Sequence, residues 1–196
     1  MKKQRMLKVE SNIKQPDPKI IQRSVEGDAK AFEVIVKQLQ EYAFALAFRI
    51  LLSTEDAQDA VQDSFIKVWN KLDSYKHKHL FTTWLYRIIV NTCLDKLKLN
   101  KQQIEYGFSD VEVSEDMEQS LINRDLARQI KLLSNSLPQK QRLAFVLIDL
   151  QCLSLSEAVY VLKLTKGQVK SNLYYARKTI RETLLKKEEG RSAYVV

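Results

Sequence analysis

The sequence predicts an all-α protein with two small helical domains joined by a flexible acidic linker, the second domain containing a helix-turn-helix. Only four glycines and three prolines interrupt the 196 residues, which leaves long stretches free for helices. Apolar residues recur at helical spacing on both sides of an acidic stretch that lacks this pattern. We therefore expect folded domains over residues 16–100 and 119–186, with a linker over residues 101–118. A basic tail over residues 1–15 and a second tail over residues 187–196 should both be flexible.

The first domain begins with sequence signals for helix starts and helix ends. Two prolines flank Asp17, which precedes a short helical segment from about Lys19 to Val25. The Gly27-Asp28 pair is typical of a helix end followed by the N-cap of the next helix. That next helix carries a core-facing stripe of Phe32, Ile35, Val36, Leu39, Ala43, Leu46, Ala47 and Ile50. The Ser-Thr pair at positions 53–54 then supplies a cap for the helix after it.

The stretch from Asp56 to Lys98 combines two helical patterns with a loop between them. In the first helix an apolar side is separate from an acidic side, so one face should pack while the other stays exposed. The packing set is Ala57, Ala60, Val61, Ser64, Phe65 and Val68. The positions elsewhere on that helix include Asp56, Gln58, Asp59, Gln62, Asp63 and Lys67.

The loop from Lys71 to Phe81 brings lysines, histidines and aromatic rings together, and the helix after it ends basic. Single-stranded nucleic acid is held by basic side chains along its phosphates and by planar side chains that stack on bases. The whole stretch is therefore suited to grip a basic protein surface on one side and nucleic acid on the other.

A second series of helical patterns begins near Gln119. Its first stripe is Leu121, Ile122, Leu126, Ile130 and Leu133, and Pro138 fits the first turn of the next helix. Ser154 with Glu157 forms a capping-box pattern that opens a short helix with Leu155, Ala158, Val159 and Leu162 on its buried side. A turn at Leu164 and Thr165 leads into a helix with apolar residues inward and basic and amide residues outward. This pattern is typical of a helix-turn-helix with a basic recognition helix.

Composition narrows the classes of function. The net charge of +8 favours an acidic partner, which by charge alone fits DNA, RNA, an anionic membrane or an acidic protein. We expect a cytoplasmic protein, because the sequence shows neither a membrane-spanning run nor a signal peptide. Cys93 and Cys152 should be reduced, mostly buried thiols, and His77 with His79 makes a poor zinc site. No cofactor, metal or small-molecule substrate is expected, and no motif of an enzyme is present.

The order of residues from Arg49 to Asp95 carries a resemblance to a known family. The string R-I-L…E-D-A-x-D-x-V-Q-D-x-F…V-W…F-x-x-W-L-Y-R-I…N…L-D closely resembles the second conserved domain of bacterial sigma factors, in the compact form of the extracytoplasmic-function branch. L-P-x-x-x-R from Leu137 to Arg142 and G-x-V-K-S-x-L from Gly167 to Leu173 resemble their fourth conserved region. The resemblance implies a non-catalytic factor that binds core RNA polymerase, recognises the −10 and −35 promoter elements and helps to melt the DNA.

The family places a role on each matched surface. Its acidic helix docks on the polymerase, which implies polymerase binding by Asp56, Asp59, Gln62, Asp63, Phe65 and Trp69. Its loop and following helix capture the melted −10 strand, which implies that role for Tyr75, Lys76, Lys78, Phe81, Trp84, Arg87, Asn91, Lys96 and Lys98. Trp84 fits a core anchor equally well. The helix-turn-helix implies −35 binding by Arg142, Lys166, Gln168, Lys170, Ser171, Asn172, Tyr174, Tyr175, Arg177 and Lys178.

This chain departs from the family at several of these positions. Gln168 stands where threonine is usual and Asn172 where arginine is usual, and lysines replace an arginine run after Asp95. Base preference therefore stays open. Because lysine lacks the bidentate fork of arginine, contacts with upstream DNA should be weaker. The acidic linker fits either a solvated tether or a mimic of nucleic acid inside the polymerase.

Two other classes of protein also fit parts of the sequence. A stand-alone helix-turn-helix regulator would bind a duplex operator by itself, usually as a dimer, but no dimerisation helix is evident. A pure interaction protein would use both domains to bind an inhibitor or scaffold. Relatives of this branch are commonly sequestered by an anti-sigma factor, so such a partner is expected beside core RNA polymerase and promoter DNA.

Overall fold

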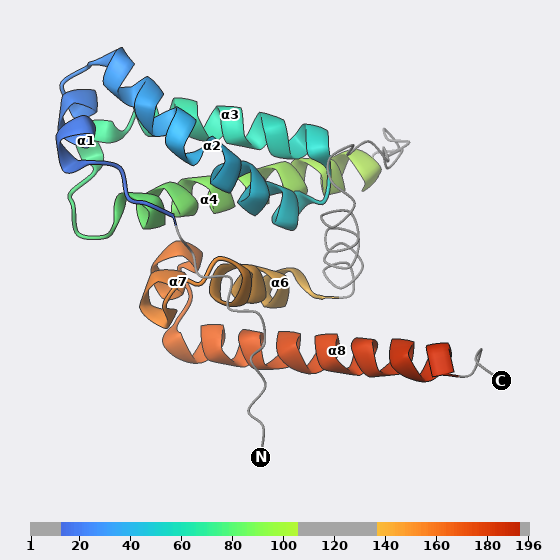
Figure 1. Ribbon diagram of the computed structural model, residues 1–196. Coiled ribbons are helices and arrows are strands. Elements are labelled where there is room, and N and C mark those ends of the chain that lie inside the picture. The colour runs from blue at the N-terminus through green and yellow to red at the C-terminus, as the bar shows by residue number, and fades with distance from the viewer. Residues whose placement is uncertain (1–12, 106–136, 193–196) are drawn as a thin grey trace. The chain divides into compact units, whose positions relative to one another are not determined.

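The computed structural model of the chain describes residues 13–105 and 137–192, and every regular element in these ranges is helical (Figure 1). The described residues fall into two compact units, one before and one after the gap. The predicted all-α class with two helical domains is therefore confirmed. The predicted linker beyond residue 105 and the stripe from Leu121 to Leu133 lie outside the described residues.

The described part of the first unit consists of four α-helices and a short 3₁₀ turn. The elements are α1 (Pro18–Val25), α2 (Ala29–Leu51), α3 (Thr54–Trp69), η1 (Leu72–Ser74) and α4 (Phe81–Glu105). Helices α2, α3 and α4 pack against one another pairwise, and α1 packs on α2 (Figure 1). The loop predicted to bind nucleic acid runs from η1 to the start of α4.

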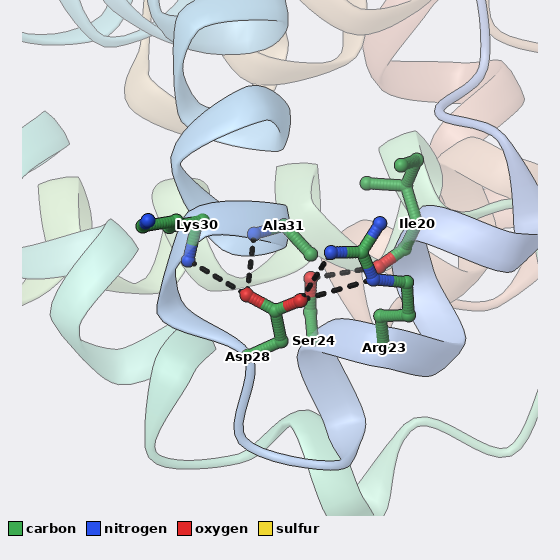
Figure 2. Close-up of polar contacts among 6 residues, drawn as sticks. All are labelled: Ile20, Arg23, Ser24, Asp28, Lys30 and Ala31. Carbon is green, nitrogen blue, oxygen red and sulfur yellow. Dashed lines mark hydrogen bonds and ion pairs between the residues drawn. The ribbon is translucent and has the colours of Figure 1, made fainter.

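The corner between α1 and α2 forms as the sequence predicts. Gly27 has a φ of +93°, a conformation that L side chains rarely adopt, and Asp28 follows it as the N-cap of α2. The Asp28 carboxylate accepts hydrogen bonds from the backbone N–H groups of Lys30 and Ala31 at 3.0 and 3.1 Å, and from the Arg23 guanidinium (Figure 2). The Ala31 N–H and then Arg23 hold the pKa of this carboxyl below its ordinary value.

The core of the first unit comes from the apolar faces of α2, α3 and α4. From α2 it takes Ile35, Leu39, Ala43, Leu46, Ala47 and Ile50, which confirms most of the predicted stripe. Phe32 and Val36, also in that prediction, are only half-buried. From α3 it takes Ala57, Ala60, Phe65 and Val68, and from α4 Phe81, Leu85, Ile89 and Val90.

The second unit contains α6 (Gln139–Phe145), a π-helical turn η2 (Val146–Leu150), α7 (Leu155–Leu162) and α8 (Lys166–Ser192). The capping box of Ser154 and Glu157 opens α7 as predicted. Helices α7 and α8 form the predicted helix-turn-helix, with Ala158, Val161, Val169, Leu173 and Ala176 buried. Val161 was not in the predicted set.

Three predicted boundaries need correction. Helix α4 continues to Glu105, into the predicted linker, and α8 continues to Ser192, into the predicted tail. Both extensions consist mainly of strong helix formers, Lys, Gln, Glu and Arg, and α8 continues through Gly190, a poor helix former, without ending there. The basic tail is also shorter than expected, because Lys14 and Gln15 are hydrogen-bonded to the first unit.

Candidate protein and nucleic-acid interfaces

The outer side of α3 is an acidic face. Ser53 caps the helix, accepting a hydrogen bond from the backbone N–H of Asp56 at 3.2 Å. Asp59, Gln62 and Asp63 are exposed and Asp56 is half-buried. Ile66, which sequence reasoning missed, is 53% exposed on the same side, four residues after Gln62. Its spacing from Gln62 and Asp63 places it among them. We call Asp59, Gln62, Asp63 and Ile66 the acidic face of α3.

The two aromatic residues predicted to bind polymerase lie partly or fully inside the unit. Phe65 is 7% exposed and meets Phe32 edge-on, with ring centroids 6.4 Å apart. Trp69 is half-buried, 5.0 Å from the same ring. The prediction for Phe65 is wrong, because its position on the helix belongs to the apolar stripe that packs in the core.

Tyr75 organises the loop between η1 and α4. Its hydroxyl donates a hydrogen bond to the carbonyl of His79 at 2.8 Å, which closes the loop on itself. Its ring lies 4.5 Å from His77, 5.3 Å from Phe81 and 5.2 Å from Trp84, measured between ring centroids. We call these four residues the ring cluster. It supports a loop whose other side chains, Lys76, Lys78 and Leu80, are exposed.

Phe81 and Trp84 play different parts in this cluster. Phe81 is 1% exposed, so its ring is not accessible for the direct contact with the −10 strand that the resemblance implied. The first turn of α4 directs its ring into the core, against Tyr75. Trp84 is half-buried, 5.6 Å from Phe81, so it anchors the cluster while part of its surface remains accessible.

Further along α4, the predicted DNA-binding cations have acidic neighbours. Lys96 Nζ lies 3.5 Å from an Asp59 carboxylate oxygen, and its side chain is 21% exposed. Lys98 Nζ lies 3.4 Å from Asp95 but remains largely exposed. Arg87 and Asn91 are half-buried. The exposed lysines of the loop are thus better placed for nucleic acid than Lys96.

The start of α8 explains two departures from the family pattern. Thr165 Oγ1 accepts from the backbone N–H of Gln168 at 3.2 Å, and Gln168 Oε1 accepts from the backbone N–H of Thr165 at 2.9 Å. This is a capping box, so Gln168 serves the helix start. Asn172 Nδ2 donates to the carbonyl of Gln168 at 2.8 Å. Both amide side chains, predicted to bind DNA, therefore already have partners within the helix.

The exposed side of α8 carries cations and an aromatic pair. Lys166, Lys170, Ser171 and Lys178 are exposed, as predicted. Tyr174 and Tyr175 are 63% and 52% exposed, and their rings meet edge-on at 5.3 Å. Two large exposed aromatic residues beside lysines are typical of a nucleic-acid surface.

The two arginines predicted to bind the −35 element are held in different ways. Arg177 makes a bidentate ion pair with Asp149 of η2, with Nε–Oδ2 at 2.9 Å and Nη2–Oδ1 at 2.6 Å. This hydrogen bonding raises the pKa of Arg177. Arg142 of α6 is half-buried, its Nε is buried without a hydrogen-bond partner, and burial lowers its pKa. Arg177 is thus exposed, as predicted, but paired with Asp149, whereas Arg142 is partly withdrawn from the surface.

The remaining sequence candidates concern metals and membranes. Cys93 is fully buried, which raises the pKa of its thiol to about 12, and Cys152 is half-buried. Within the described ranges, no group of His, Cys, Asp and Glu side chains fits a metal ion. None of the helices described for this chain is both long and apolar enough to cross a membrane.

Comparison with known proteins identifies similar sequences for both units. Residues 35–103 match the family described as Sigma-70 region 2, and residues 127–180 match Sigma-70, region 4. The ECF RNA polymerase sigma-E factor of Salmonella typhimurium is 32% identical over 177 residues, which cover 84% of this chain and 92% of the relative. The RNA polymerase sigma-H factor of Pseudomonas aeruginosa is 26% identical over 86% of this chain and 93% of its own.

Solved structures resemble the chain as well. The sigma factor RpoE of Bartonella quintana, solved in complex with the anti-sigma factor NepR, aligns with a TM-score of 0.64 and 27% identity, over 80% of this chain and 98% of that one. CnrH, solved with the cytosolic domain of CnrY, has the same TM-score at 22% identity, over 84% of this chain and 94% of that one, and supports the fold alone.

Proposed function

The chain belongs to the extracytoplasmic-function family of RNA polymerase sigma factors, and from this membership we propose how its surfaces divide the work of transcription initiation. It is a promoter-recognising initiation factor, and the family matches do not favour a stand-alone regulator. One observation supports the proposal most strongly. The first unit carries an acidic face on α3. Separately, the loop before α4 exposes lysines and is supported by the packed rings of the ring cluster.

We assign polymerase docking to the acidic face of α3. Asp59, Gln62 and Asp63 surround the exposed side chain of Ile66, which resembles an interface with an apolar centre and a polar rim. The complementary surface on the polymerase must be basic with an apolar contact point. Phe65 contributes indirectly, because its buried ring packs against Phe32 and holds α3 in position.

We assign capture of the −10 strand to the loop and the ring cluster. Lys76 and Lys78 are exposed and able to contact phosphates. The accessible part of Trp84, next to Tyr75, offers a planar wall for an unstacked base, a contact worth about 1–3 kcal/mol per base. Phe81 supports this wall from the core.

We assign contact with the −35 duplex to α8. Lys166, Lys170 and Lys178 are placed to bind phosphates, while Ser171 and the tyrosine pair face outward to base edges. Apolar ring edges make contact with the methyl groups of thymine, so we expect A·T pairs within the recognised duplex.

We further propose that an anti-sigma factor regulates this protein in the cytoplasm, where polymerase and DNA meet. The Bartonella quintana relative was solved with such a partner. The partner would compete with the polymerase for the acidic face of α3. Polymerase chemistry itself comes from the core enzyme, which this chain would direct without catalysing a step.

Docking is tested by charge reversal. We would mix full-length chain with bacterial core RNA polymerase and measure binding by size exclusion and fluorescence anisotropy. Asp59→Lys with Asp63→Lys should weaken binding at least about tenfold, as loss of interface charges does in other complexes. Glu33→Lys with Glu41→Lys on the exposed side of α2 makes the same charge change as a control. Equal binding of both double variants would reject the assignment.

The DNA surfaces are tested after a promoter is selected. Holoenzyme formed with the wild-type chain would select duplexes from a randomised library, and the enriched sequence is here called the selected promoter. Lys76→Ala with Lys78→Ala should reduce strand opening, whereas Lys170→Ala with Lys178→Ala should reduce duplex binding before opening. Permanganate reactivity of thymines reports opening, and anisotropy reports duplex binding. The reverse pattern would contradict both assignments.

A further inference from the structure

Residues 13–16 form a short strap on the first unit, just before α1. The carbonyl of Lys14 accepts a hydrogen bond from Gln38 Nε2 of α2 at 2.6 Å, and Pro16 is buried. From this strap the side chain of Gln15 reaches Thr82 at the start of α4, 67 positions later in the chain. The strap therefore joins α2 to the first turn of α4.

Gln15 makes two hydrogen bonds to one residue. Its Nε2 donates to Thr82 Oγ1 at 2.5 Å, and its Oε1 accepts from the backbone N–H of Thr82 at 3.3 Å. That N–H is among the first of α4, which have no carbonyl partner within the helix. Leu80 holds the N-cap position, since its carbonyl accepts from the N–H of Trp84, but its side chain has no polar atom. Gln15 thus supplies the cap that the local sequence lacks.

The capped turn is also the support of the basic loop. Phe81 and Trp84 lie on either side of Thr82 in the first turn of α4, and both pack on the ring of Tyr75. Tyr75 in turn holds the carbonyl of His79. A shift in the start of α4 would therefore be transmitted through the rings to the loop that carries the exposed lysines.

We propose that Gln15 is a positioning residue for capture of the −10 strand. By capping Thr82 it fixes the first turn of α4, and with it the ring cluster and the loop. Gln15 need not touch DNA for this. The inference rests on the proposed function of the loop, and it adds a residue from outside the segment of the chain that carries that function.

The experiment uses holoenzyme assembled with the full-length chain and the selected promoter. Gln15→Ala should lower the rate of strand opening by about two- to tenfold, which is the range expected for losing hydrogen bonds of this kind. Gln15→Glu should restore opening, because a carboxylate accepts from both the N–H and the hydroxyl of Thr82 and suits a helix N-terminus. Gln40→Ala, exposed on α2, serves as the matched control and should open DNA at the wild-type rate.

Two further measurements separate positioning from a general structural role. Amide exchange of Thr82 should become faster in Gln15→Ala, while binding to core polymerase stays within twofold of wild type. Wild-type opening by Gln15→Ala, or unchanged exchange of Thr82, would overturn the inference. Equal losses of opening and of polymerase binding would also overturn it, because they indicate a damaged unit.

Failure of the proposed function looks different. If Lys76→Ala with Lys78→Ala opens the selected promoter normally, the loop does not capture the strand, and the inference about Gln15 is overturned with it. If those variants open poorly while Gln15→Ala opens normally, the loop assignment stands and only the positioning role of Gln15 is rejected.

Discussion

Replacement of Phe81 by alanine tests whether this ring belongs to the protein core or to the DNA interface. The side chain is 1% exposed at the start of α4, with its centroid 5.3 Å from Tyr75 and 5.6 Å from Trp84. Removing a buried phenylalanine ring costs about 3–5 kcal/mol of stability, which includes the cavity left behind. A domain of this kind is typically stable by only about 5–15 kcal/mol, so the loss is a large fraction of the total.

Urea unfolding measures this loss in the relevant unit. The chain has two tryptophans, Trp69 and Trp84, and both lie in the first unit, so their fluorescence reports its unfolding. With an m-value of about 1.5 kcal/mol per M urea, the midpoint of Phe81→Ala should fall by roughly 2–3 M. Leu80→Ala removes the neighbouring exposed side chain and should change stability by less than about 0.5 kcal/mol.

Strand opening separates the two explanations for Phe81. A core role predicts that Phe81→Ala loses polymerase binding and strand opening together, once the first unit is partly unfolded. If Phe81→Ala instead keeps the midpoint of Leu80→Ala and loses only strand opening, the ring contacts DNA and the reasoning from burial is refuted.

Three further predictions concern charges and a thiol. Asp149→Asn releases Arg177, so the logarithm of duplex affinity should fall more steeply with the logarithm of salt concentration, by about 0.9 if one more phosphate is bound; a shallower slope would contradict this. Because burial raises the pKa of Cys93 to about 12, its peptide should stay unmodified by iodoacetamide until urea unfolds the chain, and rapid native labelling would show that the thiol is accessible. The Ala31 N–H chiefly lowers the pKa of Asp28, so the ionised carboxylate stabilises the fold above its ordinary pKa of 3.8, and this stabilisation is lost as pH falls through the lower folded value. Unfolding midpoints of wild type should therefore drop relative to Asp28→Asn as the solution is acidified below about pH 4, and parallel pH profiles would refute the linkage.

Three helix starts were predictable because N-capping depends on neighbours in sequence. Asp28, Ser53 and Ser154 each accept a hydrogen bond from a backbone N–H two or three residues later, and all three caps were expected. The start of α4 was different. Its cap comes from Gln15, far away in sequence, so no local signal pointed to it.

The surfaces were predicted well where one helical face is clearly polar. Asp59, Gln62 and Asp63 are exposed as expected, because polar side chains dominate that side of α3, although the exposed Ile66 among them was not predicted. The errors fell on aromatic residues. Phe65 and Phe81 fit both a core position and a contact surface by residue type, and only their packing on Phe32 and Tyr75 shows that they are buried.

The sequence by itself determined the helical class, the two-domain organisation, the helix-turn-helix and the family, because each follows from the spacing and order of residues along the chain. Tertiary structure alone decided which of the candidate side chains are available to a partner. Lys96 and Arg177 were expected to bind DNA, yet the fold places them beside Asp59 and Asp149, which lie 37 and 28 positions away in sequence. Availability depends on burial and on charge pairing between distant segments, and folding brings those segments together only when the helices pack.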